Sequence, residues 1–228
     1  MKFIIPLVCL VTNSFARAEL SPKLAEYLNQ RHAEFNQIDD SRRIVLEPLA
    51  KALAQGLQGD KDTIDVTFVC THNSRRSHMS QLWMKAAAES LRLPLTTWSG
   101  GTESTAMNPR AVASLRRAGF EITQTTKNNN PIYHVSMGTD TPTQTCFSKP
   151  WSSPPNPTRN FFAVMVCNDA DQKCPTVPGA TDRFAIPFVD PKISDGTEAE
   201  SATYDERCAQ IAREFLWVAH KAKELLSR

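Results

Sequence analysis

The sequence lacks a strong charge of either sign: 26 Lys and Arg stand against 24 Asp and Glu, a formal net charge of +2 over 228 residues. Nucleic acids and anionic membrane surfaces attract strongly basic proteins, so this balance favours neither partner. The sequence also lacks internal repeats, and its apolar run at residues 3–11 is too short to cross a bilayer, which needs about 20 residues. We therefore expect one globular domain with some extra elements.

The N-terminus has the order of residues that is typical of a secretory signal. Lys2 precedes the apolar run, and Ala16-Arg17-Ala18 follows it as a small-residue cleavage site. We expect residues 1–18 to be a signal peptide cleaved near Ala18, which leaves a periplasmic or secreted protein without a membrane span. The alternative interpretation is an ordinary buried N-terminal strand.

Five of the six cysteines would remain after that cleavage, and an odd number in an exported protein indicates at least one free thiol. A zinc site is not expected, because no second pair of ligands follows at the usual spacing. The cysteines therefore indicate chemistry as well as possible disulfides. They are Cys9, Cys70, Cys146, Cys167, Cys174 and Cys208.

Hydrophobic patterns divide the rest of the chain into two parts. Residues 19–60 are predicted to form a helical hairpin, with starts at Ser21-Pro22 and at Asp39-Asp40-Ser41. Residues 61–228 are predicted to form the catalytic domain. Within it, the Pro-, Ser- and Thr-rich stretch around 138–160 has no periodicity, so we expect a surface insertion there.

The catalytic domain alternates apolar, strand-like runs with helical segments. The runs lie at 64–70, 95–98, 161–166 and 184–189, and the helical segments at 76–91, 108–119 and 198–226. Strands that alternate with helices give right-handed crossovers and a parallel sheet. The predicted fold is α/β, with a small four-stranded parallel sheet covered by helices on both faces.

The loop after the first predicted strand carries a candidate nucleophile. Cys70 stands at its start, and a strand-to-helix turn can wrap backbone N–H groups around a tetrahedral oxyanion. Arg76 adds a planar fork that binds two oxygens, and the positive potential favours a thiolate at Cys70. The alternative is a buried cysteine with solvated arginines beside it. The predicted anion-binding residues are Thr71, His72, Asn73, Ser74, Arg75, Arg76 and Ser77.

This loop, residues 69–79, resembles the active-site loop of low-molecular-weight protein tyrosine phosphatases and, more closely, that of the thioredoxin-coupled arsenate reductases with the same fold. The resemblance continues at 99–103, at 108–111 and from Cys167 to the C-terminal helix. It implies that Asp190, in Phe188-Val189-Asp190-Pro191, is the general acid that protonates the leaving oxygen.

The resemblance also implies a role for the cysteine pair Cys167 and Cys174. In these arsenate reductases three cysteines act in relay, so Cys70 would attack arsenate, Cys167 would attack Cys70, and Cys174 would attack Cys167. A thioredoxin-like partner would reduce the resulting disulfide. The alternative is a structural Cys167–Cys174 disulfide in an exported protein.

Two functions therefore stay open. The first is arsenate reduction through the three cysteines, and the second is hydrolysis of phosphomonoesters through a phosphocysteine at Cys70. The substrate is a small oxyanion or a phosphomonoester, and no cofactor is expected. Gln81 and Lys127 stand where some reductases carry carboxylates that help to bind potassium, so we expect no metal, and Lys127 is a candidate for a fixed cation there.

Overall fold

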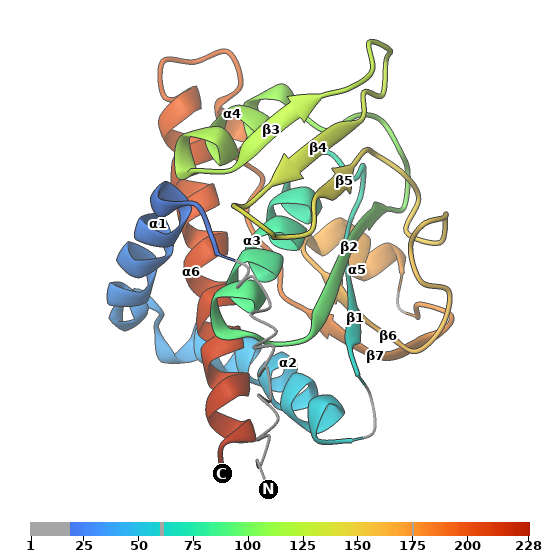
Figure 1. Ribbon diagram of the computed structural model, residues 1–228. Helices are drawn as coiled ribbons and strands as arrows, with labels where there is room; N and C mark the ends of the chain where they lie inside the picture. Colours follow the sequence, from blue (N-terminus) through green and yellow to red (C-terminus); the bar gives the residue numbers. More distant parts are fainter. Residues whose placement is uncertain (1–18, 60–61, 175) are drawn as a thin grey trace, which may run out of the picture.

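The computed structural model describes residues 19–59, 62–174 and 176–228 (Figure 1). The predicted signal peptide, with Cys9, lies outside the described residues. The helices and strands alternate through most of the chain, as the sequence predicts. In chain order they are α1 (Pro22–Ala33), α2 (Asp40–Gln58), β1 (Ile64–Cys70), α3 (Arg76–Leu91), β2 (Leu95–Gly101), α4 (Pro109–Ala118), β3 (Glu121–Gln124), β4 (Tyr133–Ser136), β5 (Gln144–Cys146), β6 (Phe161–Met165), α5 (Asn168–Lys173), β7 (Ala180–Ala185) and α6 (Glu200–Leu226), with 3-10 turns η1 (Phe35–Gln37) and η2 (Pro191–Ser194).

A four-stranded parallel sheet in the order β2-β1-β6-β7 forms the centre of the protein, which confirms the predicted fold class. Its two inner strands, β1 and β6, are buried almost throughout, as continuous apolar strands in a parallel sheet must be. The fourth strand was predicted at 184–189 and lies at 180–185. That prediction was wrong in its bounds because it followed hydrophobicity: Ile186 and Phe188 are buried beyond the end of the paired strand.

Helices cover both faces of this sheet. Figure 1 shows α3 and α6 on one side and the short α5 on the other, and α3 and α6 also pack against each other. Phe215 of α6 contacts Phe68 of β1 edge-to-face, with ring centroids 5.0 Å apart. Burial of a phenylalanine contributes about 2–3 kcal/mol, so this pair helps to fix α6 on the sheet that carries Cys70.

The two predicted N-terminal helices are present, and both pack on α6. Each begins with a side-chain cap: the Ser21 hydroxyl accepts from the Leu24 N–H, and the Asp39 carboxylate accepts from the Arg42 N–H at 2.7 Å. Tyr27 of α1 stacks on Trp83 of α3 at 5.1 Å between ring centroids. The N-terminal helices thus extend the hydrophobic core.

A second, antiparallel sheet in the order β3-β4-β5 lies beside α4 and was not predicted. The expectation that residues 138–160 lie on the surface is wrong for part of that stretch. Ser148, Lys149 and Asn156 are buried, and Pro150 forms a bridge to Gly101 at the edge of β2. This segment therefore packs beside the predicted anion-binding loop.

Candidate active site

The anion-binding loop connects the end of the central strand β1 to the start of α3. Such a position, at the carboxyl ends of parallel strands, is where α/β proteins bind ligands. Within the described part of the chain, no backbone N–H of residues 71–75 donates a hydrogen bond to another protein atom. These donors, together with the N-terminus of the 16-residue helix α3, can therefore bind a tetrahedral oxyanion.

The sulfur of Cys70 is held by a chain of polar contacts. The Cys70 Sγ lies 3.1 Å from the Ser77 Oγ, which accepts from the Asn73 Nδ2 at 2.9 Å. The Asn73 Oδ1 accepts in turn from the Lys149 N–H at 2.9 Å. Asn73 has a φ of 44°, a left-handed conformation that asparagine tolerates better than most residues. The 148–156 segment thus helps to hold the loop in its conformation through the bond from Lys149 to Asn73.

Arg76 and Asp190 face each other across the cleft. The Arg76 guanidinium donates to the Asp190 carboxylate at 2.8 Å and, with a second N–H, to the Phe188 carbonyl at 2.9 Å. A bound anion that accepts from both terminal nitrogens of Arg76 must displace the Asp190 carboxylate. Asp190 would then lie beside the oxygens of the anion. The cleft is small. It is lined by Cys70, Thr71, His72, Ser74, Arg75, Arg76 and Asp190.

Arg75 forms a second set of ion pairs that the sequence analysis did not find. Its Nε donates to the Tyr204 hydroxyl of α6 at 2.8 Å, and its guanidinium lies 3.5 Å from Asp195 and 3.9 Å from Asp190. The Tyr204 hydroxyl donates to Asp195 at 2.8 Å. Burial, then the bond to Asp195, raises the pKa of Tyr204 to about 12, so the hydroxyl stays neutral and can accept and donate together.

The second cysteine of the predicted relay lies against the loop, and the third does not. The Cys167 Sγ is 3.6 Å from the Thr71 Oγ1 and accepts from the Ala170 N–H as the N-cap of α5. Cys174 is the C-cap of the same helix and is partly exposed. Cys70, Cys167 and Cys174 are all free thiols in the structure.

Two lysine side chains, Lys127 and Lys149, have different environments. Lys127, the candidate fixed cation, is exposed. Lys149 is instead buried, with its ammonium 4.7 Å from the centre of the Phe147 ring. Burial, then the charge of Lys149, lowers the pKa of the fully buried His78 to about 3. The His78 Nδ1 lies 3.1 Å from the Ser99 hydroxyl, so a neutral imidazole lies under the loop.

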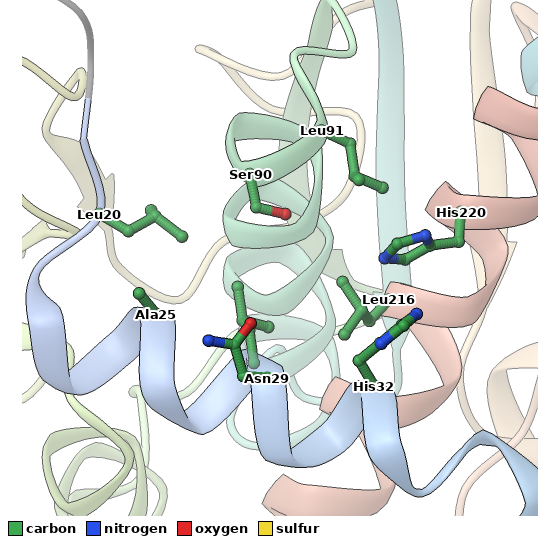
Figure 2. A pocket seen from close by; sticks show the side chains of 9 residues that line it. Leu20, Ala25, Asn29, His32, Ser90, Leu91, Leu216 and His220 are labelled. Atoms are coloured by element: carbon green, nitrogen blue, oxygen red, sulfur yellow. The ribbon is translucent and has the colours of Figure 1, made fainter.

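A larger hollow lies away from the cleft. Figure 2 shows His32 of α1 and His220 of α6 side by side, with Leu91 of α3 and Leu216 beside them. The rings stack with centroids 4.5 Å apart, and none of the predicted site residues lines this hollow. In the ranges 19–59, 62–174 and 176–228, no group of three or more metal-ligating side chains is present, and no helix could span a membrane.

The chain is similar in sequence to proteins of one family. Residues 65–136 match the family model described as low molecular weight phosphotyrosine protein phosphatase. An arsenate reductase of Bacillus licheniformis is 29% identical over 144 residues, which are 62% of this chain and 84% of the relative. Arsenate reductase 2 of Staphylococcus epidermidis is 30% identical over 134 residues, which are 58% of this chain and 80% of the relative. A solution structure of a low molecular weight protein tyrosine phosphatase from Bacillus subtilis covers 71% of this chain and 98% of its own, with 17% identity and a TM-score of 0.47.

Proposed function

Because the chain belongs to the low-molecular-weight phosphotyrosine protein phosphatase family, we propose that it is a thiol-dependent oxyanion enzyme that reduces arsenate through Cys70, Cys167 and Cys174. The observation that carries the proposal is the contact of the Cys167 Sγ with Thr71, the residue directly after Cys70, at 3.6 Å. Hydrolysis of a phosphomonoester needs no second thiol at this place. The relatives named arsenate reductase support the same choice.

The proposed chemistry begins at Cys70. Its thiolate attacks arsenic, and one oxygen leaves as water after taking a proton from Asp190. The Cys167 thiolate then attacks the Cys70 sulfur, and the electron pair of the sulfur–arsenic bond stays on arsenic. Arsenic(V) becomes arsenic(III), which leaves as arsenite, and a Cys70–Cys167 disulfide forms. Cys174 attacks Cys167 and frees Cys70, and a dithiol protein reduces the Cys167–Cys174 disulfide.

The last exchange requires α5 to unwind. Cys167 and Cys174 cap opposite ends of the six-residue helix, so a rise of about 1.5 Å per residue places their Cα atoms roughly 10 Å apart. A disulfide needs Cα atoms within about 7 Å. Only one turn or so of helix must be lost, together with the bonds that Arg183 donates to Asp171 and to the Cys174 carbonyl. We propose that formation of the disulfide and unwinding of α5 are one event.

The experiment that tests this function is the Cys174→Ser variant. It should release arsenite in a single turnover and then stop, with a Cys70–Cys167 disulfide that mass spectrometry detects as a cross-linked peptide pair. Its hydrolysis of para-nitrophenyl phosphate should stay near that of the wild type. Cys208→Ser is the control: Cys208 is buried beside Trp83, burial raises its pKa to about 12, and both activities should persist.

The alternative function is phosphomonoester hydrolysis, and the placement of Asp190 beside Arg76 favours it, because an ester leaving group also needs a proton. Wild-type protein that hydrolyses aryl phosphates but turns over no arsenate with any dithiol donor would establish this alternative. A Cys174→Ser variant that loses both activities together with thermal stability would instead indicate a structural role for Cys174.

We also propose export, on the pattern of residues 1–18. An exported reductase would take electrons from a thioredoxin-like oxidoreductase outside the cytoplasm. Cell fractionation with mass spectrometry of the mature N-terminus tests this proposal, and an intact N-terminus in the cytoplasmic fraction would contradict it.

A further inference from the structure

We propose that Arg75 is a specificity-determining residue that restricts the cleft to small inorganic oxyanions and disfavours aryl phosphomonoesters. This inference rests on the proposed function and names the substrate class of the same site. It starts from the position of Arg75 in the wall of the cleft, between the backbone donors of the loop and Asp190.

The guanidinium of Arg75 is fixed from three directions. Tyr204 accepts from its Nε at 2.8 Å, Asp195 lies 3.5 Å from its terminal nitrogen, and Asp190 lies 3.9 Å from its Nε. Its side chain is only 14% exposed, so solvent screens these pairs less than it screens surface pairs. A long side chain that is held in this way forms a rigid wall and cannot swing aside for a large substrate at low cost.

The segment that Arg75 contacts is the one that carries the proposed general acid. Asp190 begins η2 and accepts from the Lys192 N–H, and Asp195 ends the same turn. Arg75 therefore pairs with both ends of the turn and, through Tyr204, with α6. These contacts hold Asp190 close to the loop, so the space between Asp190 and Cys70 stays narrow.

The size and chemistry of the cleft agree with a small anion. The cleft is narrow where Arg76 and Asp190 pair across it. Every described side chain that lines it is polar, charged or a thiol, so the floor of the cleft offers an aromatic ring no aliphatic surface. The charge of Arg75 adds to that of Arg76 and favours an anion whose oxygens are all free.

The test separates binding from chemistry by using the Cys70→Ser protein, in which the nucleophile is inert. Calorimetry measures the Kd of inorganic phosphate, methyl phosphate and phenyl phosphate in this background, with and without a change at Arg75. We expect phosphate to bind at least tenfold more tightly than phenyl phosphate, and methyl phosphate to lie between them. Arg75→Ala should bring the phenyl-to-phosphate ratio of Kd close to one.

Two further variants distinguish the narrowing of the cleft by Arg75 from the effect of its charge and from a failure of Arg75→Ala to fold. Arg75→Lys keeps the charge but cannot reach both Tyr204 and Asp195, so it should keep phosphate binding within about threefold and still admit phenyl phosphate. Tyr204→Phe removes only the hydroxyl that holds Arg75, and it should shift the phenyl-to-phosphate ratio of Kd toward one. This variant tests the inference even if Arg75→Ala does not fold. Arg110→Ala, which removes an arginine 3.8 Å from the same Asp195 but outside the cleft lining, is the matched control.

The outcomes distinguish this inference from the proposed function. Phosphate that fails to bind the folded Cys70→Ser protein would contradict the anion site itself. Phosphate that binds well, with a phenyl-to-phosphate ratio that neither Arg75→Lys nor Tyr204→Phe changes, would overturn the role of Arg75 and leave the anion site in place. A ratio that Arg110→Ala shifts as much as Arg75→Lys would also overturn it, because the loss of any partner of Asp195 would then explain the effect.

Discussion

The Oγ of Ser77 accepts from the Asn73 side chain at 2.9 Å and lies 3.1 Å from the Sγ of Cys70. A thiolate has no proton to give, so the Ser77 hydroxyl is the donor of this pair whenever Cys70 is ionised. A hydroxyl that donates to sulfur stabilises the thiolate, the form of cysteine that attacks. The loop therefore supplies a stabilising donor to its nucleophile as well as a binding site for its substrate.

Ser77→Ala should slow every reaction of Cys70. Hydrogen bonds to charged groups contribute about 1.5–3 kcal/mol, so we expect the rate of Cys70 alkylation by iodoacetamide at neutral pH to fall roughly tenfold or more. Ser90→Ala, on the same helix and hydrogen-bonded only to the Ala87 carbonyl, is the control. Alkylation at the wild-type rate in Ser77→Ala would show that the hydroxyl does not serve the sulfur.

Arg76→Lys should be severe although the charge is kept. Arg76 uses two separate N–H groups, one for Asp190 and one for the Phe188 carbonyl, and an ammonium on a single point cannot reproduce both. Loss of a positioned donor typically lowers kcat by roughly 10²–10³. Steady-state kinetics with para-nitrophenyl phosphate and with arsenate measure this fall in kcat. The matched change Arg117→Lys, at an exposed pair with Asp205, should leave the kinetics unchanged.

Asp190→Asn should slow the chemical step by an amount that depends on the leaving group. A general acid contributes roughly 10²–10⁴, and phenyl phosphate, whose leaving group needs the proton, should lose more than para-nitrophenyl phosphate. The measurement is kcat over a series of aryl phosphates. A loss of the same size across the series would assign Asp190 a structural role through its pair with Arg76.

His78→Gln should make the fold less sensitive to acid. Burial lowers the pKa of His78 to about 3, while the unfolded chain takes up the same proton near pH 6.5. Stability is therefore lost as the pH falls below 6.5, by up to about 1.4 kcal/mol per pH unit. Between pH 7 and pH 4.5, urea unfolding should show a loss on the order of 2 kcal/mol that His78→Gln removes. His134 is exposed, so His134→Gln should leave this loss of stability unchanged.

The loop could be predicted from the sequence because its residues are contiguous. A buried strand ends at Cys70 and a helix begins at Arg76, and the five residues between them must form a tight turn rich in backbone donors. The ends of the elements were harder to predict. The apolar residues Ile186 and Phe188 lie past the end of β7, yet they are buried and their N–H groups still donate to the Met165 and Val166 carbonyls.

The surroundings of the loop could not be predicted because they come from distant segments with no local pattern. Tyr204 lies 129 residues from Arg75, in an amphipathic helix where a tyrosine is an ordinary core residue. Lys149 lies in a stretch whose composition resembles a solvated loop, yet its backbone caps Asn73 and its side chain is buried. The strands β3, β4 and β5 are three or four residues long, which is too short for alternation to show.

The bridge between Pro150 and Gly101 has a consequence for how this protein behaves at high concentration. β2 is an outer strand of the parallel sheet, and an unpaired outer strand is a template on which another chain can aggregate. At its carboxyl end Gly101 instead donates to the Lys149 carbonyl and accepts from the Trp151 N–H, while proline offers no donor of its own. Trp151 also lies so close to Gly100 that a side chain there would collide with it. Substitution of Gly100 by valine should detach this cover, and light scattering should then detect sheet-to-sheet association.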